Sequence, residues 1–209
     1  MAGTNITLQS EVGRELLPSE ADTNIKELDA RTGTGWKDLV GTIMPTPTAN
    51  PITRASFGPS GIRSEASFAI GNYADVSPFH INHDIKVGGK AYIHIHWSTD
   101  GIDTNTVKWE FQISRALGHD QAFFPAATSY FVEQAPNQTA SGAWRHYVAE
   151  VADIDALTLI EPDEVILVSV RRVSNGAVDN TDTVFGLVVD FHYEADKNAT
   201  LNKSPDFYT

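Results

Sequence analysis

Strict alternation of apolar and polar residues is the feature that most constrains the fold of this chain. In "TVKWEFQIS", residues 106–114, the apolar side chains of Val107, Trp109, Phe111 and Ile113 alternate with polar ones. Because successive side chains of a β-strand point to opposite faces, the pattern predicts a strand with one buried and one exposed face. Similar runs occur at 66–70, 90–97, 128–134, 143–151, 164–173 and 183–194, and an eighth candidate lies at 77–81.

The segments between these runs are rich in Gly, Pro, Asn and Asp, and helical periodicity is nearly absent. Strands that do not alternate with helices predict an all-β, antiparallel β-sandwich, and a jelly roll is the variant that we expect. We assign residues 65–196 to this domain. Residues 1–64 contain five prolines, which disfavour long strands, so we expect an extended, Pro-rich N-terminal arm with one short helix in "DTNIKELDAR" (22–31). Residues 197–209 form a C-terminal tail.

Composition excludes several classes of function. The 209 residues include 27 acidic and 15 basic side chains, for a net charge of −12, so we expect no direct binding of nucleic acid. The chain has no cysteine, which excludes disulfides and thiolate metal sites. No apolar run approaches the roughly 20 residues that span a bilayer, and the amino terminus lacks a signal-peptide pattern. We therefore expect a soluble protein without a membrane partner or a cleaved signal.

Two groups of apolar residues outside the predicted sandwich are candidates for docking on a partner. In the expected arm these are Trp36, Leu39, Ile43 and Ile52. In the tail, Phe207 and Tyr208 follow a polar stretch, and aromatic residues at a free end usually hold that end against another surface. We expect the first group to dock on a neighbouring subunit and the second to act as a further clamp.

The histidines of "KAYIHIHW" (90–97) raise the question of a metal site. Alternation places His94 and His96 together on the polar face of their strand, and it places Asp190 and His192 on the polar face of the run at 183–194. If the two strands are neighbours, three imidazoles and a carboxylate can converge on a divalent metal such as zinc, iron, copper or nickel. The other interpretation is that these residues only pair across strands on a polar face. We interpret His80 and His83 as turn or strand-end residues and His119 as a loop residue.

Motifs of the common catalytic sites are missing. The chain has no G-x-S-x-G elbow, no P-loop and no G-x-G-x-x-G. We therefore expect a protein that is not an enzyme and that needs no cofactor. Two alternatives stay open: a cupin-like metal enzyme that uses His94, His96 and His192, and a carbohydrate-binding lectin. The lectin would stack aromatic side chains near turns on sugars, and the candidates are Phe79, Phe123, Phe124 and Tyr130.

An ordered set of short motifs resembles a group of virion structural proteins of tailed bacteriophages. It spans residues 35–208 and consists of "GWKDL" (35–39), "FHINHDIKVGG" (79–89), "IHIHW" (93–97), "VKWEF" (107–111), "FFP" (123–125), "DFHYEAD" (190–196) and "NKSPDFY" (202–208). The resemblance implies a β-sandwich virion component, made in the host cytoplasm and present as a trimer or another symmetric oligomer. It does not imply a particular place in the particle.

Within that group we expect a capsid cement or decoration protein. Its partners would be the major capsid protein or other virion proteins, which it would hold together without covalent bonds. An extended arm that becomes ordered on assembly suits this role. A tail-associated adaptor, fibre or receptor-binding protein is the alternative within the virion.

Overall fold

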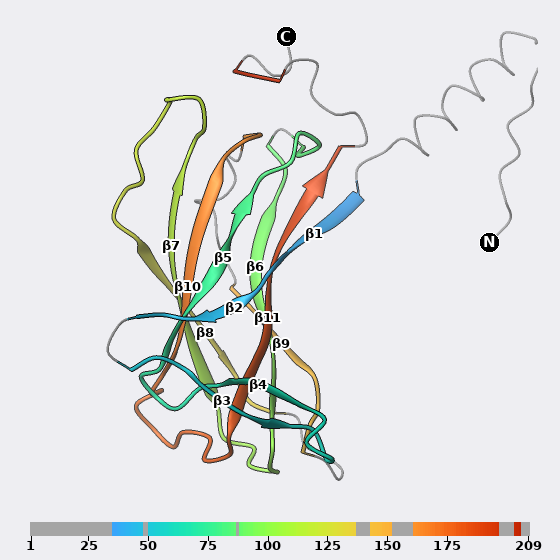
Figure 1. The fold of residues 1–209 in the computed structure, drawn as a ribbon, viewed down its shortest axis with the longest axis vertical. Helices are drawn as coiled ribbons and strands as arrows, with labels where there is room; N and C mark the ends of the chain where they lie inside the picture. The colour runs from blue at the N-terminus through green and yellow to red at the C-terminus, as the bar shows by residue number, and fades with distance from the viewer. Residues whose placement is uncertain are drawn as a thin grey trace, which may run out of the picture.

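The chain folds into β-strands joined by turns and loops (Figure 1). The computed structural model describes residues 35–47, 50–86, 88–136, 143–151, 161–196 and 203–205, and every regular element in these ranges is a strand. Among the residues described, no helix could cross a membrane. The helix expected at 22–31 and the tail residues Phe207 and Tyr208 lie outside the described residues.

Sheet A is antiparallel and has six strands around the long C-terminal strand β11 (Val184–Ala195). The strand order is β3-β4-β11-β6-β9. Strand β1 pairs with the C-terminal half of β11, whereas β4 pairs with its N-terminal end, so both lie along the same edge of β11. The other strands are β1 (Gly35–Gly41), β3 (Thr53–Phe57), β4 (Arg63–Ser67), β6 (Ala91–Thr99) and β9 (Tyr147–Glu150).

Sheet B is antiparallel and has five strands in the order β2-β5-β10-β7-β8. Its strands are β2 (Ile43–Pro45), β5 (Tyr73–His80), β7 (Val107–Ala116), β8 (Thr128–Gln134) and β10 (Val165–Val173). From β4 to β11, the chain moves between the two sheets at every step except the β7–β8 hairpin. Strands that follow each other in the chain therefore lie in opposite sheets more often than they are hydrogen-bonded to each other.

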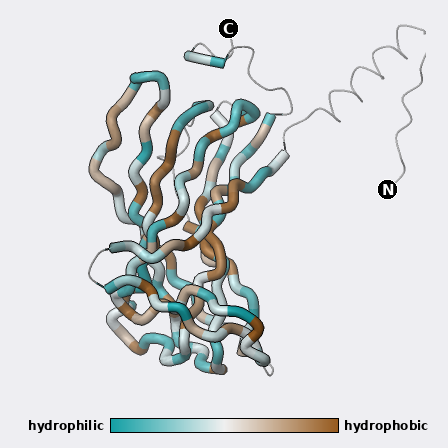
Figure 2. The backbone as a smooth tube through the Cα atoms, in the orientation of Figure 1, coloured by the Kyte–Doolittle hydropathy of each residue, from teal (hydrophilic) through white to brown (hydrophobic). Residues whose placement is uncertain are grey.

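The core lies between the two sheets and is made by residues of both. Hydrophilic and hydrophobic residues alternate along the strands, as the colours of the tube in Figure 2 show. The apolar faces predicted for 90–97 and 106–114 are confirmed, since Ile93, Ile95, Trp109 and Phe111 are fully buried. Phe68 packs edge-on against Trp109, with ring centroids 5.2 Å apart. The two antiparallel sheets thus form a β-sandwich, as expected.

The N-terminal boundary of the sandwich differs from the expected one at residue 64. Residues 35–57 already contribute β1, β2 and β3, which pair with β11, β5 and β4. The prolines do not prevent this pairing because of where they lie: Pro45 ends the edge strand β2, and Pro59 lies in the turn between β3 and β4. Edge strands and turns are the positions in a sheet that tolerate proline.

Candidate functional site

The outer face of sheet A brings together polar residues of three neighbouring strands. Asp190 on β11 lies directly opposite His94 on β6, and His94 lies directly opposite Glu150 on β9. Residues that are directly opposite in an antiparallel pair share a face and lie in contact distance. A register shift between Gly186 and Val188 sets this alignment of β11. The two strands named in the metal hypothesis are therefore neighbours.

Three side chains of this face form a group that could hold a metal ion: His94, His96 and Asp190. One possible ligand atom from each lies within 4.8 Å of the others. The Oδ2 atom of Asp190 is 2.9 Å from Nε2 of His96 and 3.6 Å from Nε2 of His94. His94 and Asp190 are each only 8% exposed, although they lie on the outer face of the sheet. We call these three residues the His-Asp group.

Charges within the His-Asp group shift the pKa of each member. Burial alone would lower the pKa of His94, but the carboxylates of Asp190, Glu150 and Asp38 together raise it above its ordinary value. Burial lowers the pKa of His96, and His94 and His146 lower it further against the attraction of Asp190. Burial would raise the pKa of Asp190, yet its two histidine neighbours hold it below its usual range. The group thus favours an ionised Asp190 beside a neutral His96.

The fourth predicted ligand, His192, lies beside the His-Asp group but is not part of it. Its Nδ1 atom is hydrogen-bonded to Oδ1 of Asp38 on β1. Its ring stacks on the ring of Trp36, with centroids 4.8 Å apart. The ring of His94 is tilted relative to it, with centroids 5.9 Å apart. His192 is thus held by β1, a strand that the sequence pattern did not predict.

A second histidine group surrounds Asp163 at the start of β10. Nε2 of His119 is 2.8 Å from Oδ2 of Asp163, and Nε2 atoms of His83 and His80 lie 3.2 Å and 3.3 Å from Oδ1. The hydrogen bond from His119 is the main cause that lowers the pKa of Asp163. Five of the seven histidines therefore lie beside Asp163 or Asp190, whereas His146 contacts His96 and His192 contacts Asp38. Sequence reasoning missed this second group, because its members come from three separate turns and strand ends with no shared motif.

The predicted docking residues of the N-terminal segment divide into two kinds. Trp36 is 47% exposed, and Leu39 is half-buried against the core. Ile43 and Ile52 are buried in the chain's own core, so the expectation that they dock on a partner is wrong. They belong to the sandwich because β2 and the bridge at Pro51 extend sheet B on this side.

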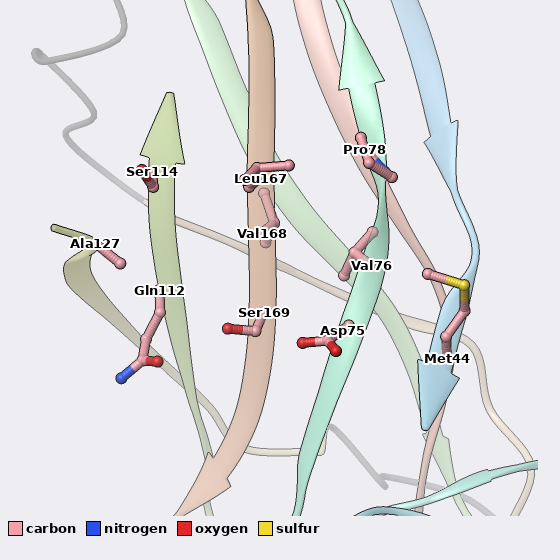
Figure 3. A pocket seen from close by; sticks show the side chains of 10 residues that line it. All are labelled: Met44, Asp75, Val76, Pro78, Gln112, Ser114, Ala127, Leu167, Val168 and Ser169. Carbon is pink, nitrogen blue, oxygen red and sulfur yellow. The ribbon is translucent and has the colours of Figure 1, made fainter. Parts of the chain in front are cut away.

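The outer face of sheet B and the loop before β8 carry exposed apolar side chains, of which the sequence indicates Phe123 and Phe124 but not the others. A depression of about 350 Å³ on this face includes Met44, Pro78, Ala127 and Leu167 in its lining, from β2, β5, the segment before β8, and β10 (Figure 3). Phe131 on β8 is 54% exposed. In the preceding loop Phe123 is 98% exposed and Phe124 is also exposed. Together with Met44 and Leu167, these three phenylalanines are called the apolar face below. The same face of sheet B also carries the ion pairs Glu110–Arg171 and Lys108–Glu133.

Two of the aromatic residues proposed for a lectin lie elsewhere. Phe79 is buried in the core, and Tyr130 is half-buried against it. Of the four, Phe123 and Phe124 are the exposed ones, and they belong to the apolar face. No protein-family model and no curated protein matches the chain.

Proposed function

We propose that this chain is a structural protein of a tailed-phage virion, a cement or decoration protein that holds neighbouring major capsid subunits together. The observation that carries the proposal is the apolar face. Monomeric proteins rarely expose grouped bulky apolar side chains, and such patches usually mark sites of protein–protein contact. Phe123, Phe131 and Met44 belong to the aromatic and methionine side chains that are enriched at protein–protein interfaces. The face therefore replaces the N-terminal arm as the main docking surface of the proposal.

We infer further that the sandwich is a jelly roll. The order β4-β11-β6-β9 in one sheet faces β5-β10-β7-β8 in the other. Eight strands distributed in this way between two sheets support the assignment. The same proposal includes a homotrimer, which the resemblance of the sequence motifs implies.

The net charge of the chain supports a place on the outside of the shell. With a net charge of −12, the chain would be repelled by packaged DNA. The lining of the depression on the apolar face contains apolar and neutral polar side chains and one carboxylate, Asp75, a composition that suits contact with another protein surface.

The proposal is tested by binding of the purified full chain to capsids that lack it. In the double variant Phe123→Asp with Leu167→Asp, two carboxylates are placed on the apolar face. We expect at least a tenfold loss of cosedimentation with capsids, because a buried unpaired charge is costly at an interface. Both side chains are exposed, so the variant should fold like the unchanged protein.

The matched control is Ile62→Asp. Ile62 is 80% exposed and lies in the turn before β4, away from the apolar face. This variant should bind capsids as the unchanged chain does. Equal binding by the double variant, or no binding by the unchanged chain, would show that the apolar face does not dock on the shell.

A further inference from the structure

We propose that the His-Asp group binds one divalent transition-metal ion of the zinc type. The inference is independent of the proposed function, since it concerns the outer face of sheet A and not the apolar face. His94 and His96 lie on β6 and Asp190 lies on β11, the two strands that pair at the centre of the sheet. A bound ion would therefore link these two strands through side chains in addition to their backbone hydrogen bonds.

The spacing of the possible ligand atoms fits the coordination shell of such an ion. In a tetrahedral site with bonds of about 2.0–2.1 Å, neighbouring ligand atoms are about 3.3 Å apart. The two distances from Asp190 Oδ2 to the histidine Nε2 atoms, 2.9 Å and 3.6 Å, lie on either side of this value. All three ligand atoms lie within 4.8 Å of one another, so the side chains must rotate toward a common centre to hold one ion.

Unpartnered buried atoms give an independent reason to expect a ligand. Within the described part of the chain, His94 Nδ1, His96 Nε2 and Asp190 Oδ1 are buried and make no hydrogen bond of acceptable geometry. Leaving a buried polar atom unpaired costs about 1–3 kcal/mol, and native structures contain few such atoms. An ion between the three residues provides the missing partner for His96 Nε2 and neutralises Asp190.

For the ring nitrogen that faces away from the proposed ion, His96 has a partner, and His94 has a carboxylate close by. Metal-bound histidines commonly hydrogen-bond through their other nitrogen, which orients the ring. Nδ1 of His96 is 2.6 Å from Nε2 of His146. Nδ1 of His94 is 3.7 Å from Oε2 of Glu150, so a small shift of this exposed glutamate makes the bond. The surroundings of the group thus match those of a metal site.

The ligand set determines which metals suit the group. Two neutral imidazoles with one carboxylate favour zinc, nickel, copper or iron(II) over calcium and magnesium, which prefer oxygen ligands. Three protein ligands leave the fourth position of a tetrahedral site for water. Asp38 and Trp36 hold the ring of His192 in place. His192 therefore lies beside the site but is not one of its proposed ligands.

The test uses the full-length protein, freed of metal with a chelator and then dialysed against equimolar zinc or cobalt(II). We expect one ion per chain by elemental analysis, a rise in the unfolding temperature, and the intense visible absorption of tetrahedral cobalt(II). In His94→Ala and Asp190→Asn, the dissociation constant for zinc should rise more than about 100-fold. Loss of a group that only hydrogen-bonds to a ligand already weakens metal binding about 10–100-fold, and loss of the ligand itself should cost more. Glu150→Gln should raise it about tenfold.

The matched control is His80→Ala, which removes an exposed histidine of the Asp163 group. This variant should keep one ion and the cobalt spectrum of the unchanged chain. Asp190→Asn is nearly isosteric, so it remains informative if His94→Ala fails to fold. No ion on the unchanged chain, an octahedral cobalt spectrum, or one tightly bound ion on Asp190→Asn would overturn the proposal.

Discussion

At the scale of single residues, Gly41 decides how the chain passes from one sheet to the other. Strand β1 of sheet A ends at Gly41, and β2 of sheet B begins at Ile43. A Cβ atom at Gly41 would lie 2.6 Å from Cζ of Phe79 and would also overlap Cγ1 of Val76. Both neighbours are core residues in a close-packed interior, so neither can move away freely.

We therefore predict that Gly41→Ala lowers the free energy of unfolding by about 1–3 kcal/mol, the usual cost of overpacking a core. Urea denaturation followed by tryptophan fluorescence measures the change. The control is Gly35→Ala, because no atom lies within 4 Å of a Cβ at Gly35. Equal midpoints for the two variants would show that the crossing has room for a side chain.

At the scale of strands, sequence periodicity predicts the strands that have one buried and one exposed face. All eight strands expected between residues 65 and 196 occur, from β4 to β11, with shifts of a few residues at their ends. The strands that it missed, β1 to β3, lie at sheet edges or beside β4 along one edge of β11. Their side chains are largely exposed on both faces, and in β1 only Gly41 is buried, so burial imposes no alternation on the sequence.

The candidate metal site was predictable in part. Alternation placed His94, His96 and Asp190 on polar faces, but the pairing of β6 with β11 is a long-range property that periodicity does not contain. The position of His192 depends on Asp38 of β1, in a segment whose prolines predict an extended arm. The Asp163 group depends on the folding of three loops onto one another, and no local pattern indicates it.

A buried tyrosine links β11 to the loop that follows β5 and indirectly to β1. The hydroxyl of Tyr193 donates to Oδ1 of Asp84 at 2.9 Å, and Asp84 is also paired with Lys37 of β1. Burial, with the charge of Asp84 and the bond to it, raises the pKa of Tyr193 to about 12. The folded chain therefore binds the phenol proton more tightly than the unfolded chain, in which the pKa is about 10.

This pKa predicts how stability changes in alkaline solution. Because the folded pKa is raised, the contribution of Tyr193 is fully present below pH 10 and is lost as the pH rises toward about 12. We expect the free energy of unfolding of the unchanged protein to fall more steeply between these values than that of Tyr193→Phe, which has no phenol to ionise. Urea titrations at a series of pH values measure both slopes. Parallel curves would mean that Tyr193 ionises alike in both states.

At the scale of the whole molecule, the two outer faces of the sandwich differ in chemistry. Sheet A presents histidines and carboxylates around Asp190, whereas sheet B presents the apolar face. A molecule with one apolar face and a strongly acidic composition is suited to lie on a large surface with its other side in solvent. This division supports a cement protein in which the apolar face meets the shell and the proposed metal site stabilises the outer sheet.

The most direct test of the central claim is the copy number of the chain in purified virions, measured by quantitative mass spectrometry against the major capsid protein. A cement protein must cover the shell, so we expect hundreds of copies in a constant ratio to the major capsid protein. A dozen copies or fewer would place the chain at the tail or at one vertex. Its absence from the particle would contradict a structural role in the virion.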